Sequence, residues 1–90
     1  MVARVFISGF VQGVGFRQFI KRSAKNIGLT GWARNSPDNR VEAVFAGSKE
    51  QIEKIISICR QGPFLSEVKD VVVDWQYQTT DTLKTFGILS

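Results

Sequence analysis

Residues 2–27 read VARVFISGFVQGVGFRQFIKRSAKNI, and the spacing of their apolar side chains changes at two glycines, Gly13 and Gly15. Before the glycines, residues 2–10 alternate and are rich in β-branched and aromatic types, which predicts a strand. After them, apolar side chains recur at the spacing of one helix face, at Phe16, Ile20, Ala24 and Ile27. Gly28 then occupies the place of the residue that follows a helix C-terminus. The stretch therefore predicts a strand, a tight loop and a helix.

Outward from this unit, the next segment has the pattern of a hairpin followed by a second helix. Residues 29–35 and 40–47 are two short strand-like runs on either side of the turn signal SPDN at 36–39. Ser48 and Gln51 then have the spacing of a capping box at a helix start. The apolar stripe of this predicted helix consists of Ile52, Ile55, Ile56 and Cys59.

The rest of the chain supplies two more strands. Gly62-Pro63 ends the second helix, residues 67–77 form a longer strand, and a polar connection at 79–82 leads to a short last strand at 86–89. The order is β-α-β-β-α-β with an extra C-terminal strand. It predicts an α/β fold of the α+β sandwich type, a ferredoxin-like arrangement with two helices packed on one face of a mainly antiparallel sheet. We expect residues 1–90 to form a single domain, since this length is near the small end of what folds on one core.

The composition excludes several kinds of site. The chain has no histidine and one cysteine, which removes imidazole bases, Ser-His triads and most zinc sites. We therefore expect no metal and no cofactor. Twelve Lys and Arg against eight Asp and Glu give a net charge of +4, which suits an anionic partner such as a phosphate ester or a nucleic acid.

The cellular setting is indicated by what the chain lacks. With Cys59 alone, no intramolecular disulfide can form, which fits a reducing compartment. No apolar run approaches the roughly 20 residues that span a bilayer, and residues 1–7 have the pattern of a strand and not of a signal peptide. We expect a cytoplasmic monomer with no membrane partner, and we expect Cys59 to be a core residue and not a reactive thiol.

The segment between the first strand and the first helix carries the most chemical information. Its glycines allow a turn in which backbone N–H groups point inward, joining the free amides of the first helical turn. Arg17 at the helix start can add two charge-assisted hydrogen bonds to the same anion. The alternative is a plain strand-to-helix turn with a surface arginine. The predicted phosphate-binding residues are Gln12, Gly13, Val14, Gly15, Phe16 and Arg17.

Asn35 is a second candidate, at the end of the run GWARN over residues 31–35. An asparagine before a turn commonly bonds its own backbone two residues further on, and local sequence favours that interpretation. In the predicted fold, however, the end of this strand lies near the loop at 12–16. An amide at that point could hold a water, because it donates and accepts at once.

Both segments resemble the signatures of the acylphosphatase family. Residues 7–17, ISGFVQGVGFR, match the first signature at each of its restricted positions, and residues 31–35 with Val41 and Gly47 resemble the second. The resemblance covers nearly the whole chain, including Gly62-Pro63 and the terminal residues 86–88. One position departs: the family usually has glycine where this chain has Asn39, the non-glycine type that best tolerates a left-handed backbone.

The resemblance implies a metal-independent acylphosphatase, which hydrolyses the carboxyl–phosphate bond of a small-molecule acyl phosphate. Inorganic phosphate would be both product and inhibitor. Arg17 would be the catalytic phosphate-binding arginine, and Asn35 the catalytic residue that positions the attacking water. The chemistry needs little more, because the carboxylate leaves as a stable anion whose conjugate acid has a pKa of about 4. The loose transition state of phosphoryl transfer asks mainly for positioning and charge stabilisation.

Two other functions are compatible with this topology. The RNA-recognition fold shares it, and residues 13–19 partly resemble the aromatic motif of that fold. The motif has to lie on a central strand, however, and here it falls in a loop and a helix, while residues 40–47 lack it. We therefore expect no nucleic-acid partner. An inactive regulatory domain is arguable only by fold analogy, and the presence of Arg17 and Asn35 counts against it.

Overall fold

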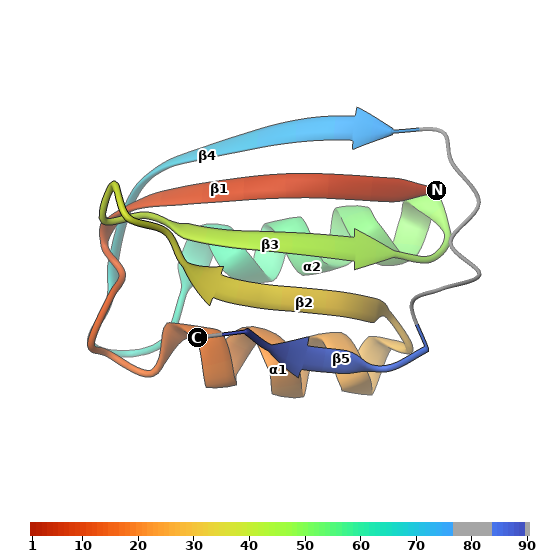
Figure 1. Ribbon diagram of the computed structural model, residues 1–90, viewed down its shortest axis with the longest axis horizontal. Coiled ribbons are helices and arrows are strands. Elements are labelled where there is room, and N and C mark those ends of the chain that lie inside the picture. Colours follow the sequence, from red (N-terminus) through yellow and green to blue (C-terminus); the bar gives the residue numbers. More distant parts are fainter. Residues whose placement is uncertain (77–83, 90) are drawn as a thin grey trace.

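The computed structural model describes residues 1–76 and 84–89, and over these residues it contains the predicted elements in the predicted order (Figure 1). Their bounds lie within one residue of those expected from the sequence. Position 77 of the expected fourth strand and the polar connection at 79–82 lie outside the described residues. The elements are β1 (Val2–Phe10), α1 (Phe16–Ile27), β2 (Thr30–Asn35), β3 (Val41–Ala46), α2 (Lys49–Gln61), β4 (Glu67–Gln76) and β5 (Phe86–Ile88).

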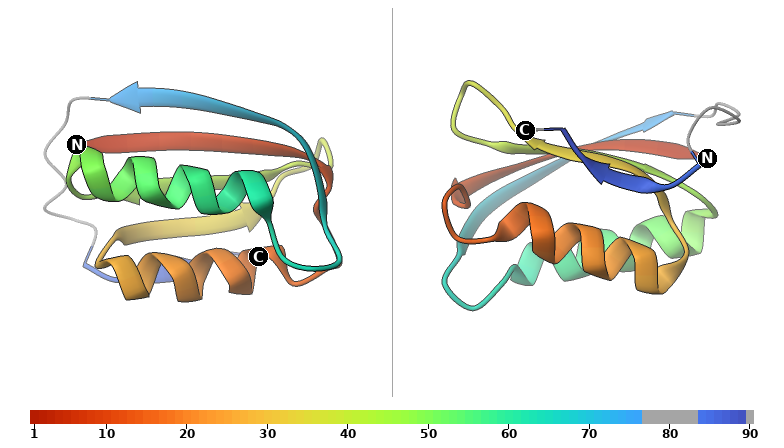
Figure 2. Two further views of the ribbon diagram at one scale, coloured as in Figure 1. Left: turned by 180° about the vertical axis from the view of Figure 1, so that it is seen from behind. Right: turned by 60° about the horizontal axis from the view of Figure 1, so that its bottom comes forward.

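The strands form one mixed sheet in the order β4-β1-β3-β2-β5. Neighbouring strands are antiparallel except for β2 and β5, which run parallel. Both helices cover the same face of the sheet, as the rotated view in Figure 2 shows. The ferredoxin-like arrangement with an extra C-terminal strand, predicted from the sequence, is confirmed.

The register of the central strands sets which residues lie at the same end of the sheet. Val41 at the start of β3 is the partner of Ile7 on β1 and also of Asn35 on β2. The chain therefore leaves β1 and β2 at the same end of the molecule, on either side of β3. In Figure 1 the loop from β1 to α1 and the turn from β2 to β3 both lie at that end.

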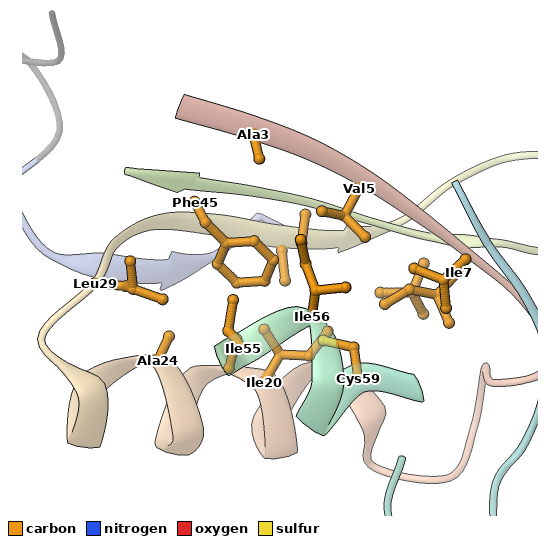
Figure 3. Packing of buried hydrophobic residues seen from close by; sticks show 14 of the residues in the cluster. Ala3, Val5, Ile7, Ile20, Ala24, Leu29, Phe45, Ile55, Ile56 and Cys59 are labelled. Atoms are coloured by element: carbon orange, nitrogen blue, oxygen red, sulfur yellow. The ribbon is translucent and has the colours of Figure 1, made fainter. Parts of the chain in front are cut away.

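The main core lies between the sheet and the helices. Alternate residues of β1 point toward the helices and are fully buried, as the strand period of two requires (Figure 3). They meet the apolar stripes of α1 and α2, and each large apolar side chain buried in this way stabilises the fold by about 1.5–3 kcal/mol. The residues that the close-up labels are Ala3, Val5, Ile7, Ile20, Ala24, Leu29, Phe45, Ile55, Ile56 and Cys59.

The two tryptophans pack against opposite faces of the sheet. Trp75 packs against the main core between the sheet and the helices. Trp32 packs against Val2, Val44 and Ala46, a smaller cluster separate from the main core.

Cys59 lies inside the core. Its side chain is 0% exposed on the apolar face of α2, and burial raises the pKa of its thiol to about 12. The thiolate is the reactive form of cysteine, so both solvent access and ionisation are suppressed. The prediction that Cys59 is a core residue is confirmed.

We expect the native protein to resist thiol reagents. At pH 8, Ellman's reagent should label Cys59 no faster than the chain unfolds, whereas the urea-denatured protein should react completely. The absorbance of the released thiolate measures both rates. Fast stoichiometric labelling of protein with a native circular dichroism spectrum would contradict the burial of this side chain.

Candidate active site

A cavity of about 240 Å³ lies where the start of α1, the end of β2 and the strand β5 meet. It includes five residues predicted from the sequence to form the site, and three that were not. The predicted residues are Gly13, Gly15, Phe16, Arg17 and Asn35, and the additional ones are Val11, Gln18 and Ile88.

The loop that enters α1 depends on two left-handed glycines. Gly13 has φ 77° and Gly15 has φ 78°, a region that costs other residues roughly 1–2 kcal/mol. A Cβ added at either position would meet nothing within 4 Å. The backbone conformation, and not lack of space, is therefore what requires glycine here.

No side chain of the described residues caps the N-terminus of α1. Gly15 is its N-cap residue and cannot accept from the first-turn amides, and the first turn contains no acidic residue. The other helix differs: Ser48 and Gln51 form the predicted capping box on α2, and Glu50 lies in its first turn. Free N–H groups and the positive end of the helix dipole make an uncapped N-terminus favourable for an anion.

Arg17 adds a full positive charge to this helix end. Its side chain is half-buried, and within residues 1–76 and 84–89 it makes no ion pair and no side-chain hydrogen bond. Three other arginines, by contrast, have carboxylate partners. Arg4 and Arg34 pair with the carboxylate of Glu42 at 3.6 and 2.7 Å, and Arg40 pairs with Asp38 at 2.7 Å. The charge of Arg17 is thus left for a ligand of the cavity.

Asn35 reaches the same cavity from the last position of β2. In the part of the chain that the structure describes, its carboxamide makes no hydrogen bond with the turn that follows. Ser36 has that role instead. Its hydroxyl lies within reach of the Asp38 carboxylate and 2.9 Å from the carbonyl oxygen of Arg40. The hydrogen bond that a turn-initiating role of Asn35 would require is therefore not found in the described residues.

The turn from β2 to β3 is held by charge and by backbone conformation. Hydrogen bonds from the side chains of Arg40 and Ser36 lower the pKa of Asp38 to about 2. Asn39 has φ 67°, and it is the non-glycine residue with positive φ in the described ranges. This is the left-handed conformation that asparagine tolerates best among the non-glycine residues.

Two of the predicted phosphate-binding residues do not line the cavity. Val14 packs against the hydrophobic core. The side chain of Gln12 is directed to the turn after β2, where it donates to the carbonyl oxygens of Ser36 and Arg40. Phosphate binding was predicted for the backbone amides of these two residues, and that prediction is independent of the structural contacts that their side chains make.

Sequence reasoning missed three residues of the cavity. Gln18 follows Arg17 and is exposed. Its polar side chain next to Arg17, off the apolar face of the helix, is the sequence feature that could have identified it as a cavity residue. Val11 is 1% exposed and is also part of the core. Ile88 comes from β5, and no local pattern connects it with the loop after β1. It joins the site because β5 pairs with β2.

A larger and more open groove lies between α2 and β4. It measures about 390 Å³ and is lined by Glu53, Ile56, Ser57, Arg60, Val73 and Trp75. Its one carboxylate, of Glu53, and its one guanidinium, of Arg60, have opposite charges. The helix that lines it is α2, whose N-terminus is closed by the capping box. The smaller cavity is therefore the better candidate for an anion.

Other kinds of site find little support in the described residues. Within them, no three His, Cys, Asp or Glu side chains gather where they could hold a metal ion. None of their helices has the length and apolar character to cross a membrane. The residues that partly resemble an RNA-binding motif, 13–19, lie in the loop and the first turn of α1 and not on a central strand.

Comparison with known proteins points to one family. A family model described as acylphosphatase matches residues 3–88. An acylphosphatase of Trichormus variabilis is 45% identical over 84 residues, which are 93% of this chain and 81% of the relative. The crystal structure of acylphosphatase from Bacillus subtilis has a TM-score of 0.93 and 31% identity, with 100% of both chains covered. An acylphosphatase structure from Coxiella burnetii has a TM-score of 0.89 and 28% identity, over 98% of this chain and 90% of that one.

Proposed function

Since this chain belongs to the acylphosphatase family, we propose that it hydrolyses acyl phosphates to a carboxylate and inorganic phosphate with the residues of the cavity at the start of α1. The amides of residues 12–17 and the Arg17 guanidinium bind the phosphate, and Asn35 positions the attacking water. One observation carries the proposal: a helix N-terminus without a side-chain cap and an arginine without a partner in the described residues open on the same cavity as Asn35.

Phosphate binding rests on complementary charge. The phosphate group brings negative charge to free N–H groups and a guanidinium that are already in place, so little reorganisation is needed. The planar fork of Arg17 can donate to two phosphate oxygens at once. Because charge spreads over these oxygens as the bond to the leaving group lengthens, the same donors stabilise the transition state.

The attack on phosphorus requires a positioned water more than a base. The leaving carboxylate is stable as an anion, since its conjugate acid has a pKa of about 4, so no side chain has to protonate it. The carboxamide of Asn35 can accept one hydrogen bond from water and donate another, which orients it without removing its proton. Asn35 suits this role because its side chain is not used by the turn that follows.

We propose that the reaction is metal-independent. The sequence has no histidine, and its one thiol is buried with a raised pKa, so the usual nitrogen and sulfur ligands are missing. The carboxylates of Asp38 and Glu42 are paired with arginines. We further propose that the protein acts as a cytoplasmic monomer on a small molecule, without nucleic acid or membrane.

Turnover of benzoyl phosphate tests the proposed function directly. The purified protein should hydrolyse it at neutral pH, with competitive inhibition by inorganic phosphate. It should be far less active on p-nitrophenyl phosphate, because the phenolate that leaves is a more basic and less stable anion than a carboxylate. An RNA-binding module or an inactive regulatory domain would hydrolyse neither compound, so an inactive, folded protein would refute the proposal.

Replacing Arg17 should remove activity and phosphate inhibition together. We expect Arg17→Ala to lose about 2–4 kcal/mol of transition-state stabilisation, by analogy with the removal of one oxyanion donor. Arg17→Lys should recover little, because an ammonium lacks the planar fork. The matched control is Arg22→Ala, which removes an exposed arginine from the same helix. Near-wild-type turnover by Arg17→Lys would contradict the bidentate role.

Removal of divalent metal should leave the rate unchanged. Benzoyl phosphate hydrolysis is measured after dialysis against EDTA and again after addition of Mg²⁺, with the metal content checked by mass spectrometry. We expect the two rates to agree within error, because within residues 1–76 and 84–89 no three His, Cys, Asp or Glu side chains gather where they could hold an ion. Loss of activity on chelation that Mg²⁺ restores would show that the site has been misinterpreted.

Replacing Asn35 should separate binding from chemistry. We expect Asn35→Ala to lower kcat roughly 100-fold or more while inhibition by phosphate stays nearly unchanged, because the loop amides and Arg17 remain. Asn35→Asp should fold and be nearly inactive, since its carboxylate would repel the incoming phosphate. The measurements are kcat, the phosphate inhibition constant and the melting temperature of each variant.

The matched control for these variants is Asn39→Gly, in the same turn. Its φ of 67° suits glycine, so the variant should fold and keep the wild-type kcat. If Asn35 only stabilised the turn, Asn35→Ala would lower the melting temperature and keep its activity below it. A stable and active Asn35→Asp would refute the water-positioning role.

A further inference from the structure

Gln12 makes a side-chain connection between two segments that the sheet itself does not join. Its Nε2 atom lies 3.0 Å from the carbonyl oxygen of Ser36 and 3.0 Å from that of Arg40. A carboxamide nitrogen carries two N–H donors, so these two bonds use both of them. Ser36 follows Asn35 directly, and Gln12 directly precedes Gly13. The connection therefore joins the residue next to the predicted water-positioning side chain to the start of the predicted phosphate loop.

The pairing of the strands alone does not bring the loop after β1 close to the turn after β2. β3 lies between β1 and β2, and strands are about 4.8 Å apart, so the ends of β1 and β2 are roughly 10 Å apart. The ladders from β3 to both neighbours end at Val41, which pairs with Ile7 and with Asn35. Beyond that level, β3 provides no ladder bond that holds the loop after β1 against the turn after β2.

The acceptors of Gln12 belong to a rigid part of the turn. Ser36 is 8% exposed, and its backbone N–H donates to the carbonyl oxygen of Arg40 at 2.8 Å. The carbonyl of Arg40 thus closes the turn and also accepts from Gln12. Both acceptors flank the turn that begins at Asn35, so a displacement of Gln12 would be transmitted to the end of β2.

We propose that Gln12 is a positioning residue, whose carboxamide fixes the end of β2 against the loop before α1 and so sets Asn35 relative to Arg17 and the loop amides. This rests on the proposed function, because it assigns Gln12 an effect on hydrolysis through Asn35. The side chain touches no substrate. Its loss would leave the backbone amides of residues 12–17 and the guanidinium in place, and would affect mainly the position of the water.

The test is a double-mutant cycle with benzoyl phosphate as substrate. We expect Gln12→Ala to lower kcat roughly 10- to 100-fold, the scale of a misplacement of about 1 Å, with inhibition by inorganic phosphate changed less than about threefold. In the Asn35→Ala background, Gln12→Ala should lower kcat no more than about twofold further, because the water is already unpositioned. Gln12→Met, which keeps the length of the side chain and lacks both donors, should behave like Gln12→Ala.

Gln51 offers a matched control. Its Nε2 atom donates to the carbonyl oxygen of Ile27 at 3.0 Å, a bond of the same type, with the same 24-residue separation as that from Gln12 to Ser36. This bond lies at the start of α2 and the end of α1, away from the cavity. Gln51→Ala should lower the melting temperature and leave kcat unchanged below it.

The outcomes separate the two proposals. Independent, multiplicative losses in the cycle, or a weakened phosphate inhibition without loss of kcat, would overturn the role of Gln12 in placing Asn35. Wild-type kcat in folded Gln12→Met would overturn it too. A wild-type protein that fails to hydrolyse benzoyl phosphate, or an Asn35→Ala variant with full activity, would instead refute the proposed function. If Gln12→Ala does not fold, the Gln12→Met arm decides.

Discussion

The burial of β1 inside the sheet, between β4 and β3, is the constraint on which the rest of the molecule depends. This strand pairs with β3 on one side and β4 on the other, while Ala3, Val5 and Ile7 are fully buried in the core. A shift by one residue would move these side chains to the opposite face, so the register is strongly fixed. The fixed register determines where the chain leaves β1, and the predicted phosphate loop begins at that point. Core packing thus sets the origin of the site.

The distribution of charge shows which end of the molecule is prepared for an anion. Arg4, Arg34 and Arg40 are paired with carboxylates, and the N-terminus of α2 is satisfied by its capping box. At α1 the same groups are left without intramolecular partners in the described residues: the first-turn amides have no side-chain cap, and Arg17 has no ion pair. Open amides and an unpaired cation at one helix end cost stability, and an anionic ligand would remove that cost.

The sequence predicted the elements well because their signals are local. The change from a two-residue to a helical period at Gly13 and Gly15 is visible in one short stretch, and the capping box at Ser48 depends on residues three positions apart. The same holds for Asn39, whose left-handed backbone follows from its residue type in a turn. By contrast, nothing near Ile88 indicates that it lines the cavity, because this follows only from the pairing of β5 with β2.

For this protein, the sequence by itself determined the order of strands and helices, the family resemblance and the identity of Arg17 and Asn35 as candidates. Each depends on residue types and spacings within a few positions of the chain. Only the tertiary structure decided that Arg17 has no partner in the described residues while three other arginines do, and that the Gln12 carboxamide donates to two carbonyls of the next turn. The hydrogen bonds of Gln12 join residues 24 or more positions apart in the chain. The pairing of the arginines depends on which of several possible carboxylates each of them reaches. Such contacts are fixed by strand register and core packing, which no local pattern encodes.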